Sequence, residues 1–189
     1  EVFFAASDIG WVVGHSYIVY GPLVHRCTTV MYEGKPVGTP DAAAYWRIVA
    51  NHKVRTLFTA PTAIRAIRRE DPHGTQLRQH DVSSLRALFL AGERADPDTV
   101  SWAGQQLQLP VIDHWWQTET GWPMVANCLG IEQLPIKPGS PAKAVPGFAI
   151  HVVDESGKQV GPGEQGALVA KLPLPPGSLP TLWNNDEQF

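Results

Sequence analysis

The feature that most constrains the fold is a repeated order of short apolar runs, each followed by a segment with helical spacing. Residues 54–59, 85–90 and 109–112 have the length and composition of buried strands. Segments that begin at Pro61 and at Pro97 follow the first two runs, and a proline suits the first turn of a helix. Because parallel strands need crossover helices between them, this order predicts an α/β fold. Its sheet is expected to be mainly parallel and flanked by helices.

The N-terminal part of the chain adds elements of both kinds. Residues 2–6 are apolar and predict a strand, and residues 27–32 predict another. Helical spacing is present over residues 15–25, although Pro22 would strain the second half of such a helix. A further helix is expected over residues 41–52, capped by the aspartate at its start. These elements extend the strand and helix alternation toward the N-terminus.

The C-terminal part has a different character. Residues 135–147 are rich in Pro, Gly and Lys and predict a loop that wraps toward the site. Residues 148–153 and 166–170 read as strands joined by a turn, which predicts a small antiparallel sheet. We therefore expect an α/β subdomain over roughly 1–135 and a loop and β-rich segment over 136–189.

Composition excludes several classes of protein. The 189 residues are 43% hydrophobic and 17% charged, with a formal net charge of −3, which suits a globular domain and not a nucleic-acid surface. No apolar run approaches the roughly 20 residues that span a bilayer, so no membrane partner is expected. Cys27 and Cys128 are expected to be reduced. A cytoplasmic location fits best, or the mitochondrial matrix if the protein is eukaryotic.

The most unusual stretch is residues 113–121, Asp-His-Trp-Trp-Gln-Thr-Glu-Thr-Gly. Tryptophans offer flat faces for a ring, hydroxyls can donate to an anion, and a carboxylate can hold a cation. The preceding run, residues 109–112, places this stretch at the carboxyl end of a strand, where ligands bind in open α/β sheets. On residue types alone, a tryptophan-rich core turn with a capping glutamate also fits, and Trp11 suits a core as well as a pocket.

Residues 113–121 resemble the adenylate-binding motif of short-chain acyl-CoA synthetases, members of the adenylate-forming (AMP-dependent) superfamily. Further segments agree with that family in the same order along the chain: Gly10-Trp11-Val12 with Gly14-His15-Ser16-Tyr17, residues 59–65, Ala91-Gly92-Glu93, and residues 173–177. The last of these looks most similar to propionyl-CoA synthetases. The resemblance covers essentially the whole chain, and several motifs in register make it specific.

The resemblance implies roles for particular residues. The pocket for the alkyl tail of the acid would be lined by Trp11, Val12, Ala91 and Trp116. The nucleotide, ATP or AMP, would contact Gly92, Glu93, Arg94, Asp113, His114, Trp115, Gln117 and Thr118. The catalytic residues would be Thr118, as a donor to the α-phosphate, and Glu119, as the ligand of Mg²⁺. Ala60 would lie along the coenzyme A channel, where a small side chain is needed.

Two positions depart from the family pattern. Arg94 replaces the usual proline of the Gly-Glu-Pro turn, which puts the conformation of that turn in doubt. Ala91 replaces the valine of acetate-specific relatives and leaves room for about one more carbon. A methylene in a closed apolar pocket discriminates by about 1–3 kcal/mol. Ala91 therefore favours propionate over acetate.

By resemblance, the complete protein is an acid–thiol ligase. It would convert a short carboxylate, with propionate favoured, and ATP to acyl-AMP and pyrophosphate, and then pass the acyl group to coenzyme A. The alternatives are an acetyl- or acetoacetyl-CoA synthetase fragment, or an inactive remnant that binds nucleotide or a partner. Small molecules are the expected substrates in either ligase.

Some expected parts of such an enzyme are missing from this sequence. A phosphate cradle is normally rich in glycine and hydroxyls and carries a lysine. Residues 161–166 contain glycines but no Ser, Thr or Lys. The family's ribose-binding aspartate and catalytic lysine would follow residue 189. We expect residues 1–189 to be the central part of an N-terminal AMP-binding domain, inactive without the N- and C-terminal parts of the same polypeptide.

Overall fold

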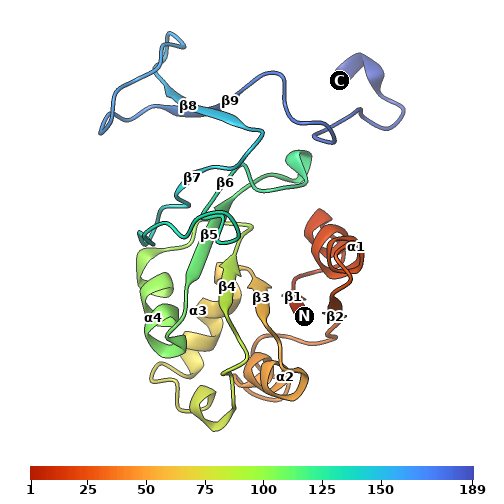
Figure 1. Cartoon of the computed structure of the whole chain (residues 1–189), viewed down its shortest axis with the longest axis vertical. Helices are drawn as coiled ribbons and strands as arrows, with labels where there is room; N and C mark the ends of the chain where they lie inside the picture. Colours follow the sequence, from red (N-terminus) through yellow and green to blue (C-terminus); the bar gives the residue numbers. More distant parts are fainter.

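The computed structural model describes residues 1–189 and contains a seven-stranded and a two-stranded sheet (Figure 1). The large sheet consists of β1 (Val2–Ala6), β2 (Thr28–Val30), β3 (Thr56–Thr59), β4 (Ala87–Leu90), β5 (Val111–Trp115), β6 (Val125–Ala126) and β7 (Lys143–Ala144). Its order is β2-β1-β3-β4-β5-β6-β7. The first five strands are parallel, and β6 and β7 are antiparallel to their neighbours. The prediction of an α/β fold with a mainly parallel sheet is confirmed.

Three helices cover one face of this sheet: α2 (Ala44–His52), α3 (Pro61–Glu70) and α4 (Pro97–Leu107) (Figure 1). Their apolar faces meet alternate residues of the strands, because successive side chains of a strand point to opposite faces. The largest fully buried side chains of this core include Trp46, Phe4, Leu57, Ile64 and Leu88. This face forms the main hydrophobic core.

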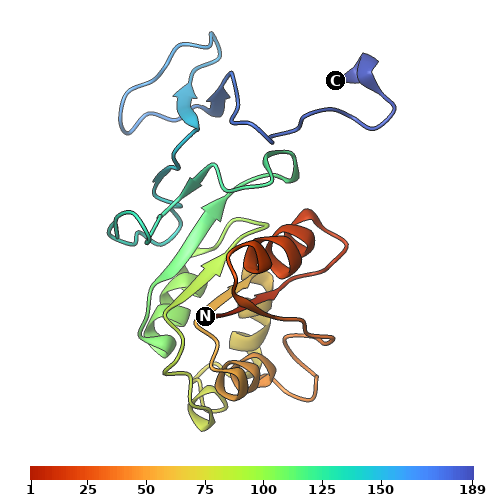
Figure 2. The same cartoon turned by 45° about the vertical axis from the view of Figure 1, so that its right-hand side comes forward.

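The opposite face is covered by one continuous helical segment, the π-helix η1 (Gly14–Tyr20) followed by α1 (Gly21–Val24) (Figure 2). Pro22 lies in the first turn of α1, where a missing N–H costs little. The helix predicted over 15–25 therefore exists, and the change from π to α geometry accommodates the proline. A second, smaller core lies under this segment and includes Val13, Ile18 and Phe58.

Some predicted boundaries were wrong. The carboxylate of Asp41 accepts a hydrogen bond from the Ala43 amide at 2.9 Å, which forms a turn before the helix, so α2 begins at Ala44 without a side-chain cap. Strand β2 is shorter than the predicted 27–32. Strand β5 extends to Trp115, further than the predicted 109–112, because its last residues pair with β6. The motif at 113–121 therefore begins inside a strand.

The C-terminal part contains β8 (Ala149–Val153) and β9 (Ala167–Lys171), which pair antiparallel as predicted. This hairpin lies beyond the β6–β7 end of the large sheet, with the C-terminal segment beside it (Figures 1 and 2). Short 3-10 turns complete the structure: η2 (Leu77–Gln79), η3 (Thr118–Thr120) and η4 (Asp186–Gln188). Cys27 and Cys128 are both free, and no helix has the length and apolarity needed to cross a bilayer.

Candidate active site

The carboxyl ends of four parallel strands meet at one edge of the large sheet. Strand pairing aligns Ala6 with Thr59, Thr59 with Leu90, and Leu90 with Asp113. The segments that follow these residues therefore lie side by side, although they are far apart in sequence. This edge is where ligands bind in open α/β sheets.

A cleft of about 1140 Å³ opens at this edge. Its walls include all four residues expected in the acyl pocket, which are Trp11, Val12, Ala91 and Trp116. They also include several residues expected to contact the nucleotide or coenzyme A, which are Gly92, Glu93, Gln117, Thr118 and Ala60. The structure thus brings together residues from four separate segments of the sequence.

The remaining expected site residues lie outside the walls of this cleft: Arg94, Asp113, His114, Trp115 and Glu119. For Asp113 and Trp115 the reason is the alternation of side chains along β5. Asp113 and Trp115 belong to one face, whereas His114 and the following Trp116 belong to the other. A stacking role for Trp115 and a nucleotide contact for Asp113, His114 and Arg94 stay predictions.

One end of the cleft is apolar and closely packed. Ala91 is buried and belongs to the small core with Val13, Ile18 and Phe58, against which Trp116 packs. Trp11, in contrast, is 63% exposed and stands at the rim. Of the two interpretations of Trp11 from residue type, the structure excludes a core position.

The turn after β4 exposes its backbone to the cleft. Gly92 has a φ of +102°, a conformation that favours glycine, and a Cβ placed there would meet nothing within 4 Å. The backbone on this side of the turn is therefore open to a ligand. Arg94, the departure from the family pattern, is exposed.

An ion-pair network holds this turn against α3. Glu93 accepts hydrogen bonds from the Thr62 hydroxyl and from Arg65, the latter at 2.7 Å. Arg65 also contacts Asp96 at 3.2 Å, and Asp96 caps α4 through the Thr99 amide at 2.8 Å. Burial acts to raise the pKa of both carboxyl groups, but hydrogen bonds from Thr62 to Glu93 and from Thr99 to Asp96, together with the attraction of Arg65, leave the pKa of each carboxyl group lowered.

The sequence did not single out Arg65, because three arginines on one helix, Arg65, Arg68 and Arg69, usually lie on a solvent-exposed face. Its side chain is 38% exposed and paired with two carboxylates, unlike that of Arg69, which is 80% exposed. The available signal was the joint presence of the segment 59–65 and the Ala-Gly-Glu motif, which the register of β3 and β4 places together.

The end of the motif forms the short helix η3. Gln117 and Thr120 form a reciprocal capping box, and Gly121 closes the turn with a φ of +62°. This arrangement leaves the side chains of Thr118 and Glu119 exposed, while Thr120 is buried. The Glu119 carbonyl accepts a hydrogen bond from the Leu179 amide at 2.8 Å, which ties η3 to the C-terminal segment.

The chain contains no cluster of three or more His, Cys, Asp or Glu side chains able to hold a metal. A single carboxylate can still hold Mg²⁺, because that ion commonly binds through one or two carboxylates together with substrate phosphates and water. Glu119 offers an exposed carboxylate with no side-chain hydrogen bond to another residue. It is the residue of the motif that would hold the ion.

Two titratable groups of β5 are shifted by burial. Burial raises the pKa of Asp113 to about 6, against the opposing effects of backbone hydrogen bonds and the charge of Arg94, and its Oδ1 has no hydrogen-bond partner. Burial also lowers the pKa of His114 to about 4, which keeps the imidazole neutral at pH 7. Its ring stacks on Phe89 with centroids 5.1 Å apart.

A second cavity of about 310 Å³ lies next to Asp113 on the α4 side of the sheet. It is walled by α4, β5 and the loop predicted over 135–147, with Asn127 and two lysines, Lys137 and Lys143, among its residues. The loop does wrap toward this edge of the sheet. It closes over the face that carries Asp113, not over the large cleft.

Comparison with known proteins identifies the family. Residues 1–174 match the family of AMP-binding enzymes. The whole chain is 53% identical to mouse mitochondrial acyl-CoA synthetase short-chain family member 3 over 28% of that protein. The chain is 47% identical to the propionate–CoA ligase of Escherichia coli, and the match covers the whole of this chain and 30% of that protein. An uncharacterized protein of Pseudomonas aeruginosa is 56% identical, with 30% of its length covered.

Solved structures agree. The crystal structure of a Brucella canis acyl-CoA synthetase superimposes with a TM-score of 0.78 at 34% identity, covering 90% of this chain and 30% of that one. An anthranilate CoA ligase in complex with anthranoyl-AMP has the same fold, with a TM-score of 0.76 at 24% identity. The chain thus spans about 30% of the length of its curated relatives. It belongs to the AMP-binding enzyme family, and within that family it is similar to the short-chain acyl-CoA synthetases.

Proposed function

We propose that residues 1–189 carry the acyl-binding side of an AMP-forming acyl-CoA synthetase that activates a short carboxylic acid, with propionate preferred. The observation that supports this is the single cleft in which Trp11, Val12, Ala91 and Trp116 are joined by Gly92 and Thr118. An apolar end beside open backbone amides and hydroxyls suits a small acid next to a phosphate. Relatives named as short-chain acyl-CoA synthetases and propionate–CoA ligases support the same conclusion.

The chemistry needs no protein nucleophile. A carboxylate oxygen of the acid attacks the α-phosphorus of ATP, the bond to the β-phosphate oxygen breaks, and pyrophosphate leaves with acyl-AMP as product. The thiol of coenzyme A then attacks the acyl carbonyl, loses its proton and displaces AMP. The protein contributes positioning and stabilisation of the charge that develops.

Residues of η3 would serve the first step. The Thr118 hydroxyl is exposed at the cleft and would donate a hydrogen bond to the α-phosphate. Glu119 would hold Mg²⁺, which offsets negative charge on the phosphate oxygens. Gly92, Glu93 and Arg94, with the residues of β5, would contact the nucleotide, and Ala60 would leave space for coenzyme A.

Ala91 would set the choice of acid. It is 5% exposed and forms part of the packed apolar end of the cleft, so an added carbon there competes directly with a carbon of the substrate. A methylene discriminates by about 1–3 kcal/mol in such a pocket. Propionate would therefore be preferred to acetate, but acetate would still react at higher concentration.

The remaining machinery would come from other parts of one polypeptide. We propose that residues 1–189 form the central part of its N-terminal domain, with an α/β subdomain over about 1–135 and a β-rich segment over 136–189. The phosphate cradle and catalytic lysine would lie outside these residues, so the segment alone would be inactive. The complete protein would work in the cytoplasm, or in the mitochondrial matrix of a eukaryote.

The test is a substrate panel on the complete gene product, preceded by its intact mass. A mass roughly three times that of the segment would support the domain proposal. The purified protein is then assayed for acyl-CoA formation from acetate, propionate, butyrate and acetoacetate with ATP, Mg²⁺ and coenzyme A. The highest kcat/KM should be for propionate. A preference for acetate or acetoacetate would correct the substrate, and a lack of turnover with every acid would favour a binding remnant.

A further inference from the structure

Trp116 packs nearly perpendicular to two other aromatic rings. Its ring is perpendicular to that of Tyr17, with centroids 5.5 Å apart and an interplanar angle of 80°. It is also nearly perpendicular to Phe58, at 6.3 Å and 75°. Edge-to-face pairs of this kind are attractive because the positive edge of one ring meets the negative face of another.

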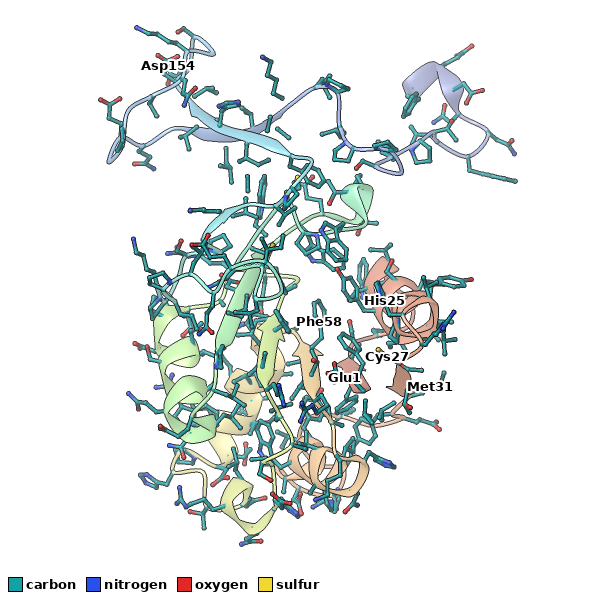
Figure 3. All side chains as sticks on the ribbon, viewed as in Figure 1. Glu1, His25, Cys27, Met31, Phe58 and Asp154 are labelled. Atoms are coloured by element: carbon teal, nitrogen blue, oxygen red, sulfur yellow. The ribbon has the colours of Figure 1, made fainter.

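The rings that face Trp116 are themselves held in a stack. Tyr17 and Phe58 lie nearly parallel, with centroids 4.8 Å apart and an angle of 10°. Trp122 stacks on Tyr17 at 6.1 Å, and His114 stacks on Phe58 at 5.8 Å. Figure 3 shows Phe58 between the sheet and the α1 helix. Tyr17 and Phe58 are thus held within a stack of rings, and Trp116 packs against that stack.

Tyr17 differs from Phe58 and Trp116 in its position relative to the cleft. It is absent from the walls of the cleft, whereas Phe58 and Trp116 line it. It comes from η1, which starts directly after the segment that carries Trp11 and Val12. Tyr17 therefore contacts a residue of the cleft wall without lining the cleft itself.

From this geometry we infer that Tyr17 is a positioning residue that sets the upper length limit of the acid by fixing the orientation of Trp116. This inference rests on the proposed function, in which Trp116 forms part of the wall of the acyl pocket. The Tyr17 ring blocks rotation of the indole away from the cleft. Without that ring, the indole gains an alternative orientation, and the end of the pocket opens toward η1.

The first test measures acid choice in the complete gene product. The Tyr17→Leu variant should raise the ratio of kcat/KM for pentanoate to that for propionate by about tenfold, the effect of one or two methylenes in a pocket. The change should lie in the KM for the acid, with the KM for ATP unchanged. Tyr17→Phe keeps the ring and should retain the native ratio.

A matched control is available on the same helix. Tyr20 is 65% exposed, and Tyr20→Leu removes a tyrosine from η1 without touching Trp116, so its ratio should equal that of the native protein. If Tyr17→Leu fails to fold, Phe58→Leu removes the other ring that faces Trp116 and should shift the ratio in the same direction. A native ratio in the folded variant would overturn the inference.

The second test needs no activity and so separates this inference from the proposed function. The near-ultraviolet circular dichroism of the native protein minus that of Trp116→Phe isolates the signal of a fixed Trp116 indole. In the Tyr17→Leu background this difference should fall by more than half, and in the Tyr17→Phe and Tyr20→Leu backgrounds it should persist. An unchanged difference in the Tyr17→Leu background would overturn the positioning role, whatever acid the enzyme accepts.

Discussion

Substitution of Ala91 by valine is the perturbation that bears most directly on acid choice. Ala91 follows β4 at the carboxyl edge, is 5% exposed, and packs in the small core with Val13, Ile18 and Phe58. Valine adds two methyl groups at a position that is packed against these residues on the protein side. The added atoms must therefore occupy the cleft, where Trp116 forms the adjacent wall.

The size of the effect follows from the carbon that is displaced. Burial of one methylene contributes about 0.8 kcal/mol, and a closed pocket that loses space for it discriminates by about 1–3 kcal/mol. The ratio of kcat/KM for propionate to that for acetate should therefore fall by about 5- to 150-fold in Ala91→Val. The change should lie in the kinetics of the acid, because Ala91 is assigned to the acyl pocket and not to the nucleotide site.

The assay is steady-state acyl-CoA formation by the complete gene product with each acid. Ala87→Val is the matched control. Ala87 is also buried on β4, on the same strand face as Ala91, but about 13 Å from it along the strand. The Ala87→Val variant should destabilise the fold by a similar amount without changing the ratio of kcat/KM for propionate to that for acetate. An Ala91→Val variant that folds and keeps the native ratio would refute the placement of Ala91 in the acyl pocket.

Three further predictions follow from the site. Glu119→Gln should slow Mg²⁺-dependent adenylation while the far-ultraviolet circular dichroism stays unchanged, since Glu119 is exposed; an unaltered rate would remove its assigned role. Because the pKa of Asp113 is raised in the fold, the native protein loses stability as pH rises through about 6, and Asp113→Asn should gain up to about 3 kcal/mol relative to it between about pH 4 and pH 7 in urea unfolding. A pH-independent difference would contradict this. Arg65→Met should cost less than about 1 kcal/mol of stability, because the ion pairs of Arg65 are partly exposed. It should nevertheless raise the KM for ATP, because the ion pair with Glu93 holds the turn after β4. Arg69→Met is the control, and equal KM values for the two variants would argue against this role of Arg65.

The fold could be predicted from local signals because each signal has a direct physical cause. Alternating apolar runs and helical spacing gave the order of strands and helices. The prolines at positions 61 and 97 marked the starts of α3 and α4, where both helices begin. The Gly and Pro pair at residues 21–22 was a poorer guide, because the change from π to α geometry accommodates it.

The candidate site was predictable only as a set of segments. The motifs identified which loops converge, and the register of β3, β4 and β5 brings them to one edge. Which face each side chain takes depends on how far β5 continues, and its pairing with β6 is not visible in the local sequence pattern. The alternation of side chains along β5 places Asp113 and Trp115 on the opposite face of the strand from Trp116. The roles of Arg65 and Tyr17 depend on partners from other elements and so were missed.

Acid-dependent exchange of labelled pyrophosphate into ATP by the complete gene product, without coenzyme A, is the decisive experiment for the proposed function. This exchange isolates the adenylation step, which the cleft at the carboxyl edge is proposed to serve. We expect exchange that requires Mg²⁺ and a short acid, is fastest with propionate, and falls sharply in Glu119→Gln. Exchange that no carboxylic acid supports would contradict the assignment of this cleft to acyl-adenylate formation.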